Sequence, residues 1–188
     1  MLPPNYVLRH ATPSDIGELE TLIALSARVL GANDYSAAQI EGALRCAFGV
    51  DTELIRDRTY FAADYGGKLI GCGGWSRRRT LFGGDARPDR DAAELDPRQD
   101  AAKIRAFFVH PDFARRGIGA TILERCERDA VAHGFGRFEM MATLPGVRLY
   151  AARGYVAGDP IQWPIGAGLT ITFVPMTKRV ADNALAVD

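Results

Sequence analysis

The sequence feature that most constrains the fold lies in residues 104–132, which have the pattern of a strand, a glycine-containing turn and a helix. The apolar run at its start ends at His110 and Pro111, where proline offers no backbone donor for strand pairing. The second half has charged residues on one face and apolar residues at helical spacing on the other, at Ile118, Ile122, Cys126 and Ala130. The stretch therefore predicts a strand that leads through a glycine-containing turn into a helix.

The turn carries Gly117 and Gly119 and has the features of an anion site. Glycine lets the backbone approach a ligand closely. The first turn of a helix has N–H groups without intrahelical acceptors and a partial positive charge, so the two together suit a pyrophosphate. The Walker loop is excluded because Ala120 and Thr121 stand where it needs lysine and serine or threonine, and the dinucleotide fingerprint is excluded because Ile122 stands at its third glycine. A lone pair of such glycines more often only permits close helix–strand packing.

A second motif, residues 149–155 with the sequence LYAARGY, follows further along the chain. With both motifs present, the chain resembles the GNAT superfamily of acetyl-CoA-dependent N-acetyltransferases. Residues 109–111 match the family's strand corner, residues 114–119 match its Q/R-x-x-G-x-G/A loop, and residues 149–155 match its F/L-Y-x-x-x-G-F/Y helix. The chain departs from this pattern at Ala114, where the family has glutamine or arginine, so Arg115 or Arg116 is expected to supply the positive charge.

The resemblance implies a single acetyl-CoA-dependent N-acetyltransferase domain over residues 1–188. The implied fold is α/β (α+β), with a mixed, mostly antiparallel central sheet and helices on both faces. The sheet is expected to open in a V between the strands at residues 104–109 and 137–143. The implied reaction moves an acetyl group from acetyl-CoA to a primary amine of a small-molecule acceptor, by direct attack in a ternary complex.

The resemblance also assigns roles to single residues. Tyr150 is expected to be the general acid that protonates the departing CoA thiolate, with a packing tyrosine as the alternative. A backbone N–H near Phe108 or Val109 is expected to face the thioester carbonyl. The full set of expected cofactor-binding residues is Phe107, Phe108, Val109, Arg115, Arg116, Gly117, Ile118, Gly119 and Ala120.

The general base is left open by the sequence. Lys103 stands where family members often have a glutamate, and a protonated lysine cannot accept a proton. Asp100, Glu139, the acids of residues 81–100 and a water chain are the alternatives. Two other functions also stay open: a non-catalytic acyl-CoA-binding regulatory domain, which would not need Tyr150, and transfer of a longer acyl group or transfer to a protein N-terminus or lysine.

Composition excludes several classes of partner. Lys+Arg and Asp+Glu both number 23, so the net charge is zero and neither a nucleic acid nor an anionic membrane is an expected partner. No run of apolar residues is long enough to span a bilayer, and the N-terminus lacks the pattern of a signal peptide. The three cysteines have no metal-ligand spacing and fit a reducing compartment, so we expect a cytoplasmic protein without a bound metal. A homodimer is expected from the family resemblance alone.

The rest of the chain predicts the elements that surround this centre. Thr12 and a capping box at Ser36 and Gln39 predict two helices, ending near Gly31 and Gly49. Residues 59–64 and 68–75 predict a hairpin, and residues 81–100 a long loop, interpreted as a lid over the acceptor site. After a short helix at residues 146–153, strands are expected at 155–156 and 169–176, with an irregular connection between them and a weakly ordered tail beyond residue 178.

Overall fold

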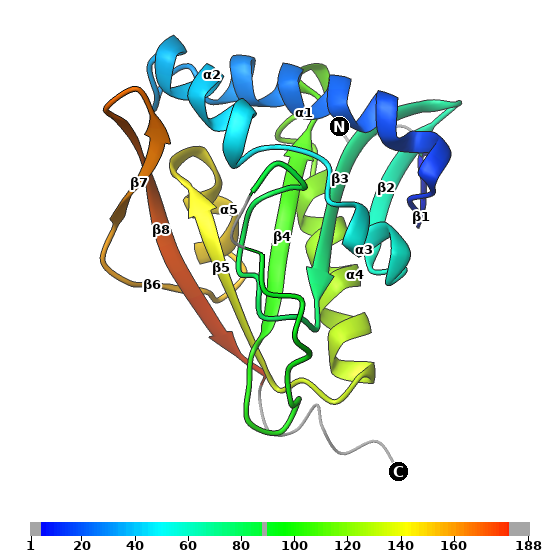
Figure 1. Ribbon diagram of the computed structural model, residues 1–188. Helices are drawn as coiled ribbons and strands as arrows, with labels where there is room; N and C mark the ends of the chain where they lie inside the picture. The colour runs from blue at the N-terminus through cyan, green and yellow to red at the C-terminus, as the bar shows by residue number, and fades with distance from the viewer. Residues whose placement is uncertain (1–4, 88–89, 181–188) are drawn as a thin grey trace.

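The computed structural model describes residues 5–87 and 90–180, which form one mixed sheet with helices on both of its faces (Figure 1). The strands are β1 (Val7–His10), β2 (Tyr60–Tyr65), β3 (Lys68–Ser76), β4 (Ala102–Val109), β5 (Arg137–Thr143), β6 (Val156–Ala157), β7 (Ile161–Gly166) and β8 (Leu169–Arg179). The α-helices are α1 (Ile16–Leu30), α2 (Ala37–Cys46), α3 (Thr52–Arg56), α4 (Ile118–Ala132) and α5 (Val147–Ala151).

The sheet has the order β1-β2-β3-β4-β5-β8-β6, with β7 paired to β8, and all its pairs are antiparallel except β4 with β5. That parallel pair is short: Ala102 pairs with Phe138 and Lys103 pairs with Glu139. Beyond these residues the two strands diverge, as Figure 1 shows. The predicted mixed, mostly antiparallel fold is therefore confirmed, and the V opens toward the ends of β4 and β5.

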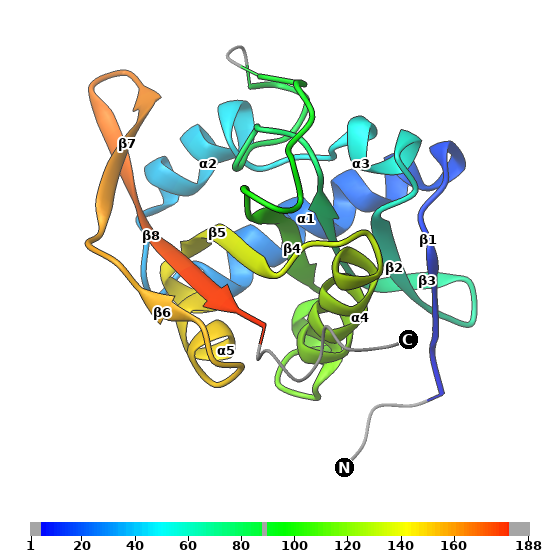
Figure 2. The ribbon, with the colours of Figure 1, turned by 90° about the horizontal axis from the view of Figure 1, so that it is seen from below.

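Strand alternation places the two hydrophobic cores on opposite faces of the sheet. In β2, Tyr60 and Ala62 pack with α1, α2 and α3, whereas Phe61 and Ala63 pack with α4 and α5. Successive side chains of a strand point to opposite faces, so a strand covered on both faces is apolar throughout. In the view of Figure 2, α4 and α5 lie on one side of the sheet, and α2 and α3 lie on the other.

A β-bulge shapes the outer half of β4. The register between β3 and β4 shifts between Cys72 and Gly74, and Ala106 has a φ of 58°, which a non-glycine residue rarely adopts. The Tyr60 hydroxyl donates to the Ala106 carbonyl at 3.4 Å. A Cβ at Gly73 would lie 2.8 Å from the ring of Phe107, so the absence of a side chain there lets that ring pack against β3. The bulge turns β4 away from β5 and contributes to the V.

Arginine ion pairs fasten the long segment between β3 and β4. Arg78 pairs with Asp57 at 2.7 Å, and Arg90 pairs with Asp51 at 2.7 Å. Arg105, on β4, pairs with Asp51 and donates to the Gly83 carbonyl at 2.8 Å. These ion pairs therefore hold the segment against α3 and β4.

Most predicted elements are present, with one clear correction. Residues 157–168 were expected to be an irregular connection, but β7 forms a hairpin with β8. The sequence around Pro164 and Gly166 did not predict a strand, because proline offers no N–H to a sheet and glycine weakens a strand. In β7 this costs little, because the strand pairs on one side only and Pro164 faces Thr170 at a register irregularity. The predicted tail lies largely outside the described residues, and β8 continues to Arg179.

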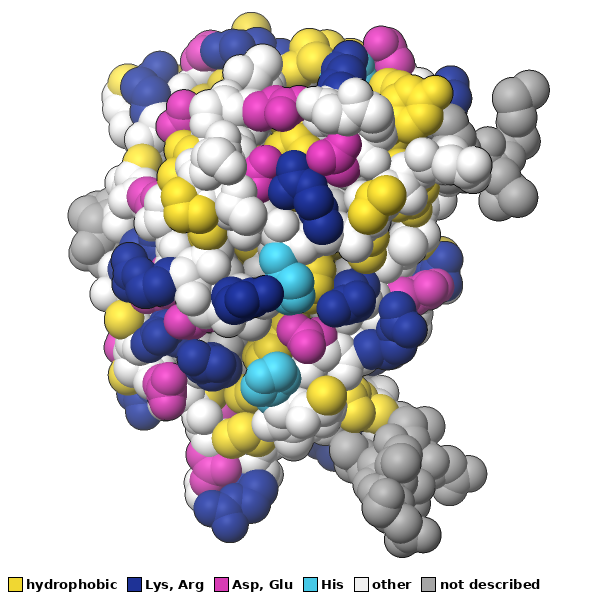
Figure 3. Space-filling model, turned by 90° about the vertical axis from the view of Figure 1, so that its right-hand side faces the viewer, with side chains coloured by type: hydrophobic (Ala, Val, Ile, Leu, Met, Phe, Trp, Pro, Cys, Tyr) yellow, Lys and Arg dark blue, Asp and Glu magenta, His cyan; other side chains and the backbone are white. Residues whose placement is uncertain are grey.

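Basic and acidic side chains are intermingled on the face of the molecule shown in Figure 3, in keeping with the balanced composition. Within residues 5–87 and 90–180, no helix has both the length and the apolar character needed to cross a bilayer. In the same part of the chain, no three His, Cys, Asp or Glu side chains are grouped so that they could hold a metal ion.

Candidate active site

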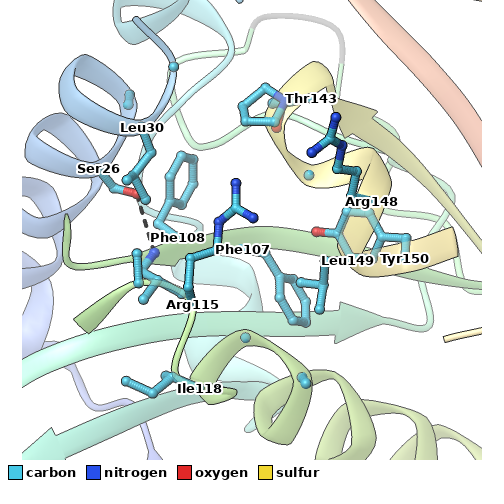
Figure 4. Close-up of a pocket in the computed structure, with 18 of the residues that line it drawn as sticks. Ser26, Leu30, Phe107, Phe108, Arg115, Ile118, Thr143, Arg148, Leu149 and Tyr150 are labelled. Atoms are coloured by element: carbon cyan, nitrogen blue, oxygen red, sulfur yellow. Dashed lines mark hydrogen bonds between the residues drawn. The ribbon is translucent and has the colours of Figure 1, made fainter. Parts of the chain in front are cut away.

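A cavity of about 380 Å³ lies in the opened part of the V, between α1, the outer half of β4, the start of α4 and α5 (Figure 4). It gathers every predicted site residue except Arg116, whose guanidinium lies over the Phe113 ring instead, 5.6 Å from its centroid. The predicted residues that line the cavity are Phe107, Phe108, Val109, Arg115, Gly117, Ile118, Gly119, Ala120 and Tyr150.

The start of α4 presents backbone donors to this cavity. Gly117 is the N-cap residue and has a φ of 83°, which glycine adopts without strain. The first intrahelical bond runs from the Thr121 N–H to the Gly117 carbonyl at 2.9 Å, so the N–H groups of Ile118, Gly119 and Ala120 have no acceptor within the helix. No atom outside its own chain neighbours lies within 4 Å of the position of a Cβ at Gly117, so the turn leaves open space above its backbone.

Two arginines add positive charge around these donors. Arg115 has a φ of 61° and lies directly before the helix start, and Arg148 reaches toward the cavity from α5, as Figure 4 shows. A helix N-terminus with unpaired N–H groups and nearby guanidinium groups is suited to a phosphate or pyrophosphate.

The backbone of β4 faces the same cavity from the side. The Val109 N–H donates to the hydroxyl of Ser26 on α1 at 3.3 Å, the dashed line in Figure 4. The next N–H, of His110, donates to the Ile70 carbonyl of β3 at 2.9 Å. Because successive N–H groups of a strand point to opposite sides, Val109 rather than Phe108 directs its donor into the V.

Tyr150 lies at the inner end of the cavity. Its side chain is 7 % exposed and packs edge-on against Phe107 and Tyr155, with ring centroids 6.1 and 6.0 Å away. Figure 4 shows its hydroxyl directed into the cavity, and within the described part of the chain this hydroxyl has no hydrogen-bond partner. Burial raises the pKa of Tyr150 above its ordinary value, so the phenol stays protonated at neutral pH.

A second, smaller cavity of about 60 Å³ lies on the other side of the V, below the segment between β3 and β4. The two cavities meet where β4 and β5 diverge, because both are lined by Phe48, Phe107, Phe108, Thr143 and Tyr150. The first cavity extends from this point to the start of α4, and the second extends to Phe82.

Among the described residues, none of the expected base candidates lines either cavity, and Asp89 lies outside the described residues. Lys103 pairs with Glu139 at the closed end of the V, and neither residue lines a cavity. Asp100 accepts from the Asp96 N–H at 2.8 Å, in the segment before β4. Trp163 packs edge-on against Phe82, with ring centroids 4.8 Å apart, and lines neither cavity.

In the N-terminal part of the chain, no individual residue was predicted to line the site. Ser26, Leu30, Tyr35 and Phe48 line the first cavity, and Arg148 was not singled out either. One signal was available: Ser26 stands at an apolar position of the α1 stripe, where a buried polar residue needs a partner.

An acetyltransferase (GNAT) family model matches residues 32–155. The chain therefore belongs to the GNAT acetyltransferase family, and the protein is an enzyme of the N-acetyltransferase class. No curated protein sequence matches the chain.

Solved structures of the same fold agree with this membership. A GCN5-related N-acetyltransferase from Rhodopseudomonas palustris has a TM-score of 0.70 and 23 % identity, over 96 % of this chain and 99 % of that chain. The PaiA N-acetyltransferase from Thermoplasma acidophilum, solved with coenzyme A, has a TM-score of 0.63 and 16 % identity, over 94 % and 99 %. YncA from Salmonella typhimurium, a putative acetyltransferase solved with acetyl-CoA, has a TM-score of 0.63 and 14 % identity, over 98 % and 99 %.

Proposed function

We propose that the enzyme transfers an acetyl group from acetyl-CoA to the primary amine of a small molecule, by direct attack in a ternary complex. The observation that carries this proposal is the junction of the two cavities at Tyr150, with a phosphate-suited helix start at the far end of one of them. Two related structures contain coenzyme A or acetyl-CoA, which supports the choice of co-substrate.

The first cavity holds the co-substrate along its length. The unpaired N–H groups at the start of α4 bind the pyrophosphate, with Arg115 as the adjacent cation. The pantetheine arm lies in the V beside β4, where a carbonyl competes with Ser26 for the Val109 N–H. The thioester then reaches the point where the second cavity opens.

The acceptor amine enters from the second cavity and attacks the thioester carbonyl carbon. A C–N bond forms, and the C–S bond breaks as the tetrahedral intermediate collapses. Tyr150 gives its phenolic proton to the departing sulfur, and water takes the proton lost by the amine nitrogen. Tyr150 regains a proton from solvent, which its raised pKa favours.

Calorimetry with acetyl-CoA and a Gly119→Asp variant tests the binding half of the proposal. A Cβ at Gly119 already meets Leu149 at 3.1 Å, and the added carboxylate would face the pyrophosphate. Two like charges 4 Å apart repel by roughly 4 kcal/mol at an effective dielectric constant of about 20, so we expect a loss of at least ~100-fold in affinity.

Gly17→Asp is the matched control, because it makes the same change in the first turn of α1 with open space around it. Its acetyl-CoA affinity should equal that of the wild type. Release of free thiol from acetyl-CoA with a panel of amines tests the transfer half. Unchanged binding by Gly119→Asp would refute this cofactor site.

A further inference from the structure

A continuous row of aromatic rings forms one wall of the second cavity and extends to the protein surface. Phe108 packs against Phe48 at 5.8 Å, Phe48 against Phe173 at 6.2 Å, and Phe173 against Phe82 at 5.2 Å, all measured between ring centroids. Trp163 continues the row, 4.8 Å from Phe82. These rings come from α2's exit, β4, β7, β8 and the segment after β3, so the wall exists only in the folded chain.

Residues 82–84 cover this cavity and form the roof of it, and contacts on two sides hold them in place. The Asp85 N–H donates to the Val50 carbonyl at 2.9 Å, and the Gly83 carbonyl accepts from the Arg105 guanidinium at 2.8 Å. A Cβ at Gly84 would lie 2.7 Å from the Val50 carbonyl oxygen, so the two segments touch backbone to backbone. A closed roof favours a small, flat acceptor over an extended polypeptide, which needs an open groove with backbone partners.

The described lining of this cavity contains no acidic side chain. Among the described residues that line the second cavity, Arg105 is the one charged side chain, and none of them is Asp, Glu or His. Arg87 lies over the Phe82 and Trp163 rings, 4.3 and 4.9 Å from their centroids. Asp51, Glu53, Asp85 and Glu139, which lie near this cavity, are each in an ion pair with an arginine or lysine.

We infer that the acceptor is an aromatic amine whose amino group is uncharged at neutral pH, such as an aniline. A cavity whose described lining is largely apolar and contains no carboxylate penalises an ammonium ion, because the ion loses its hydration and gains no counter-charge. An amine attached to an aromatic ring is already the free base at pH 7 and needs no side-chain base before it attacks. The flat ring fits the aromatic wall of Phe48, Phe82 and Phe173. This inference rests on the proposed function.

The test compares two isomers, 4-methylaniline and benzylamine. The nitrogen is bonded to the aromatic ring in 4-methylaniline, which is neutral at pH 7, and to a methylene carbon in benzylamine, which is protonated. Thiol release from acetyl-CoA is measured with each across pH 6–9.5. The amino group of benzylamine, like that of lysine, titrates well above pH 7, so most benzylamine molecules are charged at pH 7. Because the more basic free amine is the better nucleophile, part of this penalty is offset, and we expect kcat/KM at pH 7 to favour 4-methylaniline by at least 10-fold. Benzylamine should gain with rising pH, whereas 4-methylaniline should stay level.

A Phe82→Ala variant tests whether the ring lies in the aromatic wall. We expect the KM for 4-methylaniline to rise about 10-fold with the affinity for acetyl-CoA unchanged, in the range that aromatic contacts contribute. Leu169→Ala, an exposed position in the β7–β8 hairpin, is the control and should change neither value.

Two results would overturn the inference while the proposed function stands. One is turnover of benzylamine at pH 7 equal to or above that of 4-methylaniline. The other is turnover of putrescine without turnover of 4-methylaniline. Absence of acetyl-CoA binding in calorimetry would overturn the proposed function and this inference together.

Discussion

Replacing Tyr150 with phenylalanine removes one oxygen atom from the point where the two cavities meet. The change isolates chemistry from folding because the Tyr150 hydroxyl has no hydrogen-bond partner within the described residues and points into the cavity. Phenylalanine keeps the edge-on contacts with Phe107 and Tyr155. We therefore expect the free energy of unfolding to change by less than about 0.5 kcal/mol.

The expected loss of rate follows from the acidity of the two partners. General acid catalysis typically contributes ~10²–10⁴ in rate. Burial raises the pKa of Tyr150, which widens its distance from a thiol of pKa about 8.5, so the contribution belongs at the low end. We expect kcat to fall about 100-fold at pH 7, equivalent to ~2.7 kcal/mol in activation free energy. The affinity for acetyl-CoA should stay near the wild-type value.

Thiol release with a saturating acceptor measures kcat, and calorimetry measures acetyl-CoA affinity. The deficit should narrow above pH ~8.5, where the thiolate leaves without a proton, and because the pKa of Tyr150 is raised, the wild type keeps its acid there. Tyr155→Phe is the matched control, since it removes the same atom from a neighbouring buried tyrosine that lines neither cavity. Full turnover by Tyr150→Phe at pH 7 would show that Tyr150 only packs and that the acid lies elsewhere.

Two further predictions concern ion pairs. Asp51 is fully buried between Arg90 and Arg105, so Asp51→Asn should lower the free energy of unfolding by about 3–5 kcal/mol, and a loss below ~1 kcal/mol in urea titration would contradict this. A hydrogen bond from Arg9 lowers the pKa of Asp15 to about 2, so its stabilisation is present above the unfolded-state pKa of about 3.9 and is lost as pH falls toward 2. Since Arg9 is about one-third exposed, Asp15→Asn should cost only ~1–2 kcal/mol at pH 7, and the difference from the wild type should vanish near pH 2.

The parts of the fold that the sequence predicts well are those set by local signals. The helix after the glycine turn was expected from the spacing of Ile118, Ile122, Cys126 and Ala130, and α4 contains all four as buried residues. The strand at residues 137–143 has the predicted bounds. In each case the signals are the spacing of apolar residues and a flanking glycine or proline. Both signals lie within a few residues of the element, so the element can be predicted without the rest of the chain.

The parts that escaped prediction depend on contacts between distant segments. Ser26 and Phe48 reach the cavities only because α1 and α2 pack across the V. The aromatic wall joins Phe82 to Phe173, residues that no local pattern connects. Residues 81–100 carry several acids and arginines, and nothing in their order shows that Arg90 pairs with Asp51 rather than with a neighbour.

The cofactor side of the proposed active site is built from local sequence signals, whereas the acceptor side is built from contacts between distant segments. The cofactor side consists of one turn and one helix start, so its chemistry depends on the glycines at 117 and 119 and on backbone groups. On the acceptor side, Arg105 of β4 pairs with Asp51 and donates to the Gly83 carbonyl. These two contacts hold the segment over the second cavity in place. Substitutions in that segment therefore change the shape and charge of the acceptor cavity while the start of α4 stays in place. Acceptor choice in this enzyme is accordingly expected to follow Phe82 and its neighbours rather than the phosphate loop.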